Sequence, residues 1–188
     1  QYGFRKNIST SMALLNLIDK ISTSIENNEN TVGVFLDLAK AFDTVNHTIL
    51  LSKLFHYGIR GITLDWFSNY LTNRYQYVHL NKTESEKLPV SCGVPQGSIL
   101  GPLLFLLYIN DLNSTIHLLT IIMFADDTNL FISGKDLSAL TQTINTELNV
   151  ITTLFSANLL SLNVKKLITY YLVIKKHLTF LSQLIMNK

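Results

Sequence analysis

Two apolar runs with a very short polar interruption constrain the fold of this sequence more than any other feature. Residues 118–125 and 129–133 are rich in apolar side chains, and only Asp126, Asp127 and Thr128 separate them. The pattern therefore predicts an antiparallel β-hairpin with two carboxylates at its tip.

A third carboxylate closes another apolar run. Residues 31–37 combine β-branched and aromatic side chains without polar alternation, which is typical of a strand buried on both faces, and Asp37 ends the run. If the two strands are neighbours in one sheet, Asp37 and Asp126 meet in an acidic cleft. Clustered carboxylates repel unless a cation neutralises them, and oxygen ligands select a hard ion such as Mg²⁺. Taken singly, each acid is more typical of a turn or a helix cap.

The remaining periodicity mixes helices with short strands. Apolar residues at three- and four-residue steps predict a helix capped by Ser9 and Thr10 that ends before residues 27–30. A strand-like pattern that weakens follows Leu160. Together these elements indicate an α+β fold. The other predicted elements are helices at about 48–57, 63–71, 99–112 and 137–155, strands at 74–80 and 87–91 around a longer polar loop, and a Gly- and Pro-rich loop at 92–98.

Composition excludes several classes of protein. The chain has 188 residues, enough for one domain or one domain and a fragment, and Gln1 in place of an initiator Met suggests a piece of something longer. Only 15% of residues are charged, against about 25% in a typical domain, which suggests apolar surface made for a missing neighbour. A single cysteine, Cys92, excludes a disulfide framework. The longest apolar stretch, 99–109, is shorter than the ~20 residues of a membrane span, so no membrane partner is expected.

Five motifs in one order resemble the reverse transcriptases of non-LTR retrotransposons, most like the jockey-type and related insect elements. The resemblance covers residues 1–166. The motifs are residues 1–5 (QYGFR), similar to the fingers–palm junction, 35–43 (FLDLAKAFD), similar to the first palm motif, 93–102 (GVPQGSILGP), similar to the second, 124–127 (FADD), similar to the third, and 160–166 (LSLNVKK), similar to the fourth.

This resemblance implies an RNA-directed DNA polymerase. The expected fold is a polymerase palm, a small antiparallel sheet packed on helices, with part of the fingers and no thumb, over residues 1–166, followed by a divergent tail at 167–188. The implied reaction is two-metal transfer of dNTPs to a primer 3′-OH, with two Mg²⁺ ions for which Mn²⁺ can substitute. The implied partners are an RNA template, a DNA primer, dNTP and the missing fingers, thumb and endonuclease of a full-length element protein. The implied location is the nucleus.

The resemblance also assigns the metal ligands. Asp37 and Asp126 would hold both metals, Asp127 would make a looser contact, and the Leu38 carbonyl would add a ligand. These groups are all oxygens, as Mg²⁺ requires. The catalytic group would be completed by Lys165 or its neighbour in the fourth motif, placed near the leaving pyrophosphate as a charge stabiliser or proton donor. A solvated lysine pair is the alternative.

Three further residues are implied to contact substrate. Phe42 resembles the residue that blocks a ribose 2′-OH, while Gln96 and Gly97 lie where the backbone approaches the incoming nucleotide or template. The alternatives are that Phe42 belongs to the core and that residues 95–97 form an ordinary turn before a helix.

The sequence departs from the family pattern in ways that keep other functions open. Leu167 follows the two lysines where the family has Thr, a Trp usual near Leu154 is missing, and the basic fingers residues that grip the triphosphate are absent. These departures favour a second interpretation, an inactive palm remnant with at most weak nucleic-acid binding. A nucleotidyl cyclase or metal-dependent phosphatase would need acids near Asp37, but not residues 96–97 ahead of the acidic hairpin.

Overall fold

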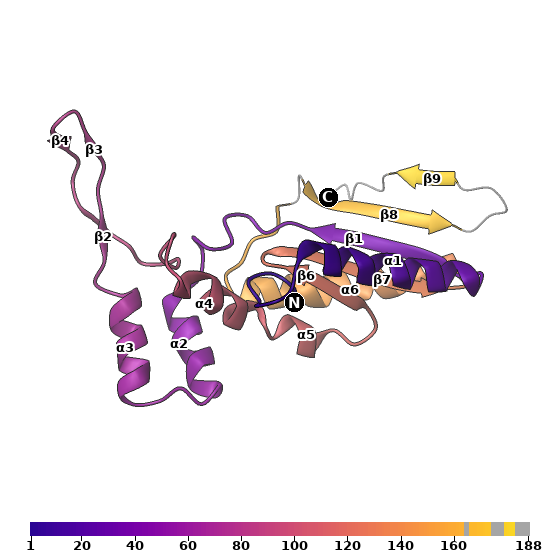
Figure 1. Cartoon of the computed structure of the whole chain (residues 1–188), viewed down its shortest axis with the longest axis horizontal. Coiled ribbons are helices and arrows are strands. Elements are labelled where there is room, and N and C mark those ends of the chain that lie inside the picture. The colour runs from indigo at the N-terminus through magenta and orange to yellow at the C-terminus, as the bar shows by residue number, and fades with distance from the viewer. Residues whose placement is uncertain (164–165, 174–178, 183–188) are drawn as a thin grey trace. The chain divides into compact units, whose positions relative to one another are not determined.

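The chain forms two compact units. The computed structural model describes residues 1–163, 166–173 and 179–182. The first unit comprises Gln1–Ala39, Asp111–Ala157 and Ser161–Lys188, and the second comprises Lys40–Asn110 and Asn158–Leu160. Figure 1 labels most of the helices and strands of both.

A five-stranded antiparallel sheet in the order β6-β7-β1-β8-β9 is the centre of the first unit. Side chains of the central strand β1, among them Val32 and Val34, are fully buried. The predicted buried strand and the predicted hairpin are thus both present and adjacent. Two strands, β8 and β9, fall in the segment expected as a divergent tail. The bounds are β1 Asn30–Leu36, β6 Thr120–Phe124, β7 Asp127–Gly134, β8 Ile168–Val173 and β9 Thr179–Ser182.

The tip of the β6–β7 hairpin is tighter than predicted. Asp127 pairs with Phe124, and Thr128 pairs with Met123, so both belong to the ladder. The prediction of a three-residue tip is therefore wrong, since the turn consists of Ala125 and Asp126 alone. Of these two residues only Ala125 has a positive φ, +56°, which is the sign pattern of a type II′ turn. Such turns match the twist of paired strands, which explains why the ladder continues to the turn.

Helices cover both faces of this sheet. Ser9 caps α1 (Thr10–Glu26) as predicted, accepting a hydrogen bond from the Met12 N–H. The Oγ of Ser24 on α1 lies 2.7 Å from the Oγ of Ser133 on β7. On the next residue of β7, a Cβ built on Gly134 would lie 3.2 Å from Leu140 of α6 (Leu137–Ala157). Successive strand residues face opposite sides, so α1 and α6 pack on opposite faces.

The second unit is a small helical cluster with a projecting hairpin. Its helices are α2 (His47–His56), α3 (Ile62–Leu71) and α4 (Leu100–Ile109). They bury a shared apolar core of Leu50, Leu54, Leu71, Leu104 and Phe105. The single helix predicted over 99–112 is wrong in extent, because α4 ends at Ile109 and a short helix, α5 (Leu112–Thr115), begins after two polar residues. Polar side chains compete with the helix for backbone hydrogen bonds, which explains a break there.

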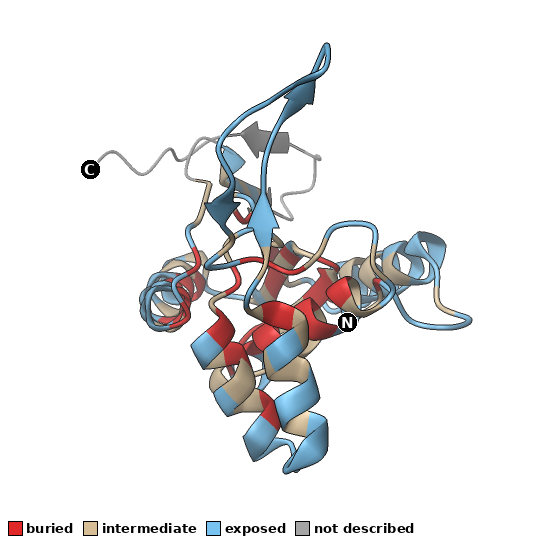
Figure 2. Ribbon diagram, turned by 90° about the vertical axis from the view of Figure 1, so that its left-hand side faces the viewer, coloured by how far each residue is buried: buried red, intermediate tan, exposed pale blue. Residues whose placement is uncertain are grey.

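The hairpin of the second unit also has a tighter turn than predicted. Strands β3 (His79–Leu80) and β4 (Thr83–Glu84) lie beyond β2 (Tyr75–Gln76) and β5 (Leu88–Pro89). The longer polar loop predicted at 81–86 is therefore wrong, since part of it is β4. Asn81 and Lys82 both have positive φ, as in a type I′ turn. Residues of all four short strands are exposed (Figure 2).

Candidate active site

Strand register brings the predicted carboxylates to one end of the five-stranded sheet. Leu36 of β1 is paired with Thr128 of β7. The next residue toward this end is Asp37 after β1 and Asp127 on β7, so these two residues come opposite each other on one face. Asp126 lies in the turn directly before Asp127. The three acids of the sequence prediction thus share one edge of one sheet.

Negative charge is crowded at this edge of the sheet. The pKa of Asp127 is raised above its ordinary value, first by burial and then by the negative charges of Asp126 and Asp37. The positive charge of Lys166 acts in the opposite direction and does not cancel the shift. A site with surplus negative charge of this kind favours a cation or a proton.

A segment of the fourth motif runs beside Asp37. Leu38 forms an isolated antiparallel bridge with Leu162. The Ala39 N–H donates to the Ser161 carbonyl at 2.8 Å, and the Asn163 N–H donates to the Asp37 carbonyl at 2.8 Å. Both bonds use residues that flank the bridge, so neither engages the carbonyl of Leu38, the backbone oxygen implied as a ligand.

Two side chains of the same segment contact the Asp37 carboxylate. The Asn163 Nδ2 donates to Asp37 Oδ2 at 2.9 Å, and the Lys166 Nζ lies 3.3 Å from the same oxygen. Lys165, the predicted catalytic lysine, lies outside the described residues. Sequence reasoning did not single out Asn163, and its only signal was its position inside the fourth motif.

Whether these residues suit a divalent metal depends on chemistry and on arrangement. The donors are all oxygens, and the surplus charge at Asp127 would be neutralised by a cation, so the chemistry fits Mg²⁺ or Mn²⁺. Within the described part of the chain, however, no three His, Cys, Asp or Glu side chains are grouped to hold a metal. One Asp37 oxygen is also engaged by Asn163 and Lys166. The donor atoms therefore fit the metal in their chemistry, but the described side chains are not grouped as a complete set of metal ligands.

In the second unit, the first and second motifs are held together by their backbones. The Gly93 N–H donates to the Val45 carbonyl at 2.8 Å, and the Val94 N–H donates to the Phe42 carbonyl at 2.9 Å. Gly93 has φ +85°, and a Cβ there would lie 2.8 Å from the Asp43 carbonyl oxygen. Only glycine permits this close approach.

The three predicted substrate-contact residues have different surroundings in this unit. Phe42 is half-buried, with its ring centroid 4.6 Å from that of Phe105, as the core alternative expects. Gln96 is exposed, and its Nε2 donates to Asp43 Oδ1 at 2.7 Å. A Cβ on Gly97, where φ is +76°, would meet no atom within 4 Å. The loop thus offers open backbone at Gly97 beside an anchored amide.

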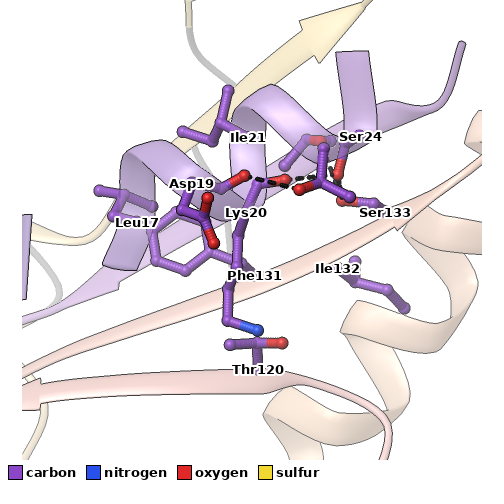
Figure 3. A pocket seen from close by; sticks show the side chains of 11 residues that line it. Leu17, Asp19, Lys20, Ile21, Ser24, Thr120, Phe131, Ile132 and Ser133 are labelled. Atoms are coloured by element: carbon purple, nitrogen blue, oxygen red, sulfur yellow. Dashed lines mark hydrogen bonds between the residues drawn. The ribbon is translucent and has the colours of Figure 1, made fainter. Parts of the chain in front are cut away.

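A cavity of about 350 Å³ lies elsewhere in the first unit, between α1 and the sheet (Figure 3). The hydroxyls of Ser24, Thr31 and Ser133 hydrogen-bond to one another beside it. None of the predicted site residues lines it. This cavity is therefore separate from the sheet edge that carries Asp37, Asp126 and Asp127, the carboxylate edge, which is identified by its chemistry.

Comparison with known proteins defines the class. Residues 1–184 match the sequence model of the reverse transcriptase (RNA-dependent DNA polymerase) family. The chain therefore belongs to the reverse transcriptase family, and the match extends past residue 166, where the recognisable motifs end.

The curated relatives are proteins of non-LTR mobile elements. The chain is 32% identical over 151 residues to the RNA-directed DNA polymerase from mobile element jockey of Drosophila melanogaster, covering 75% of the chain and 16% of that protein. It is 35% identical over 112 residues to the probable RNA-directed DNA polymerase from transposon X-element of the same species, covering 60% and 12%. The chain thus spans less than a fifth of these relatives. No helix in the described residues is both long and apolar enough to cross a membrane.

Proposed function

We propose that this chain is the palm, with part of the fingers, of an RNA-directed DNA polymerase from a jockey-like non-LTR element. It would extend a DNA primer on an RNA template with dNTPs, in the nucleus, as part of a protein that supplies the remaining fingers, a thumb and an endonuclease. The observation that carries the proposal is the register of β1 and β7, which puts Asp37 and the Asp126-Asp127 pair at one sheet edge. The raised pKa of Asp127 supports it, since it reflects uncompensated charge at that edge.

In this proposal Asp37, Asp126 and Asp127 bind two Mg²⁺ ions, with the Leu38 carbonyl as a further ligand. The ions would activate the primer hydroxyl and steady the leaving oxygen. A lysine of the fourth motif, Lys165, would stabilise the leaving pyrophosphate.

The nucleotide contacts implied by the family resemblance would come from three further residues. Phe42 would exclude a ribose 2′-OH, while Gln96 and Gly97 would border the incoming nucleotide or template. The exposure of Gln96 and the open space at Gly97 are compatible with these roles.

Primer extension on an RNA template with Mg²⁺ tests the proposal. Asp126→Ala is expected to lower incorporation about 100-fold or more, because a metal supplies several kcal/mol of charge stabilisation and 1.36 kcal/mol is tenfold in rate. Asp65→Ala, which removes an exposed acid on α3, is the matched control and is expected to keep the activity. Equal incorporation by the chain and by Asp126→Ala would reject the catalytic assignment.

A non-catalytic remnant is the second candidate. The contacts of Asn163 and Lys166 with Asp37 favour it, because they occupy an oxygen that a metal would need. This candidate predicts no extension by the chain itself at any Mg²⁺ concentration, together with weak nucleic-acid binding that Asp126→Ala leaves unchanged.

A further inference from the structure

The first three residues of the chain contact the turn that carries Asp126. The Tyr2 N–H donates to the Met123 carbonyl at 2.8 Å. The Gln1 Nε2 donates to the Ala125 carbonyl at 3.1 Å, and its Oε1 accepts from the Ala125 N–H at 3.1 Å and from the Gly3 N–H at 2.9 Å. One side-chain amide therefore satisfies both backbone groups of the residue before Asp126.

The turn needs such support because of its backbone conformation. Ala125 has φ +56°, in the region that glycine adopts readily and other residues occupy at a cost. Such conformations persist where surrounding contacts determine them. Ala125 is itself buried, so its backbone groups depend on protein partners rather than on water. The contacts from Gln1 are the ones that meet this requirement.

Gly3 is required by the same contact. A Cβ at residue 3 would lie 2.3 Å from the Ala125 nitrogen, closer than real Cβ atoms approach, and 3.0 Å from the Ala125 Cα. The backbone of residues 1–3 therefore lies directly on the turn. The QYGFR motif resembles a family stretch, and none of its residues belongs to the candidate site described above. Its first and third residues, Gln1 and Gly3, are the ones that contact Ala125.

We propose that Gln1, supported by Gly3, is a positioning residue that holds the Ala125–Asp126 turn and so fixes the place of Asp126 relative to Asp37. Gln1 suits this role because a carboxamide carries a donor and an acceptor together, and Ala125 presents one of each. A glutamate would keep the acceptor and lose the donor. A methionine, of similar length, would lose both. The inference rests on the proposed function only in that Asp126 is taken as a metal ligand.

Amide hydrogen exchange on the whole chain tests the contact without any assay of activity. Gln1→Met is expected to speed exchange of the Ala125 N–H about tenfold, since it removes the Oε1 that accepts from this N–H. Exchange at Val34 and Leu130, in the β1–β7 ladder, is expected to stay unchanged. Gln1→Glu should keep the protection of Ala125, and Gln142→Ala, an exposed glutamine on α6, is the matched control.

Manganese binding, followed by the electron paramagnetic resonance signal of free Mn²⁺, tests whether the contact positions Asp126. We expect Gln1→Met to weaken Mn²⁺ binding several-fold, Asp126→Ala to weaken it further, and Gln142→Ala to leave it unchanged. In primer extension with the concentration of folded chain matched between variants, Gln1→Met should lower kcat with little change in the nucleotide KM.

The two measurements separate the possible failures. Unchanged exchange at Ala125 in Gln1→Met would overturn the contact itself. Faster exchange with unchanged Mn²⁺ binding in Gln1→Met, while Asp126→Ala weakens binding, would overturn the positioning role and leave the proposed function intact. Equal Mn²⁺ binding by the chain and Asp126→Ala would overturn the proposed function and the positioning role together.

Discussion

Asp127 is the residue at which the charge of the carboxylate edge can be measured directly. Its raised pKa means that the folded chain holds this proton more tightly than the unfolded chain does. The favourable contribution of the protonated group is therefore present below the ordinary pKa of 3.8 and is lost as the pH rises through the raised folded-state pKa. Once ionised, the Asp127 carboxylate works against folding unless a cation is bound.

Asp127→Asn should consequently stabilise the metal-free chain in a pH-dependent way. We expect its melting temperature in EDTA to exceed that of the unchanged chain at pH 7, and the difference to shrink toward pH 4, because protonation removes the repulsion from Asp126 and Asp37. Thermal melts at the two pH values measure this. Asp65→Asn is the control, and a difference of the same size at both pH values would contradict the expectation.

The hydrogen bond between Gln96 and Asp43 fixes the polarity of a predicted substrate contact. A carboxylate only accepts hydrogen bonds, so the Gln96 amide must turn its Nε2 toward Asp43 and its Oε1 away. The Oε1 of Gln96 would therefore accept from a hydroxyl or N–H donor on nucleotide or template, while the second hydrogen of Nε2 stays available to donate.

Asp43→Asn should release this orientation, because an asparagine can donate to Gln96 as well as accept. We expect the Gln96 side-chain NH₂ signals in an amide NMR spectrum to shift, and the nucleotide KM to rise about fivefold, equivalent to roughly 1 kcal/mol for one hydrogen bond. Unshifted NH₂ signals would contradict the assignment. Asp65→Asn serves again as the control.

Sequence reasoning found the acids and missed their supporting residues for one physical reason. Asp37 and Asp126 stand out because a carboxylate beside an apolar run is conspicuous within a short window. Gln1, Asn163 and Asp43 act through partners far along the chain, as with Gln1 and Ala125 or Asn163 and Asp37. No local pattern marks such a polar residue, so its role becomes visible only when the fold brings the partners together.

At the scale of elements, helices were more predictable than turns. The periodicity of residues 137–155 predicted α6, and Leu140, Ile144, Leu148 and Ile151 are all buried on it. The turns at Ala125–Asp126 and Asn81–Lys82 were missed because they need residues with positive φ, which alanine and lysine do not favour. Asn81 does favour positive φ, but a type I′ turn needs it at both central residues, and Lys82 gives no such signal.

The inner face of α6 provides a stability prediction. Ile151 is fully buried and Val150, its neighbour in sequence, is 38% exposed. We expect Ile151→Ala to lower the free energy of unfolding by about 2–5 kcal/mol, through lost burial and the cavity left behind. Val150→Ala should change it by less than about 0.5 kcal/mol. Urea denaturation of both variants measures the difference, and equal effects would show that α6 does not pack as described.

For the whole molecule, the low charged fraction agrees with the surface observed. On α1 the side chains of Leu14, Leu15 and Ile18 are each at least half exposed. The sequence indicated surplus apolar surface from composition alone, but only the structure identifies the helix that carries it. The α+β class was predictable from periodicity, whereas the order of the strands was not, because pairing between distant strands leaves no periodic signal.

Net charge leads to a prediction about nucleic-acid binding. With a formal charge of +2, the chain should bind an RNA–DNA duplex weakly and with strong salt dependence. If about three phosphates are neutralised, affinity should fall roughly 40-fold between about 50 and 200 mM salt. Filter binding at the two concentrations tests this, and tight binding that is insensitive to salt would contradict it.

The central place of β1 has a consequence for how the chain is made. This strand leaves the ribosome well before its partners, which include Ile132 on one side and Tyr171 on the other. Until those partners emerge, its unpaired backbone N–H and C=O groups and its apolar side chains remain open to other chains, and pairing across such separations is slow. Production of this protein should therefore benefit from slow translation at low temperature, and a shortened chain that stops before β8 should accumulate as aggregate.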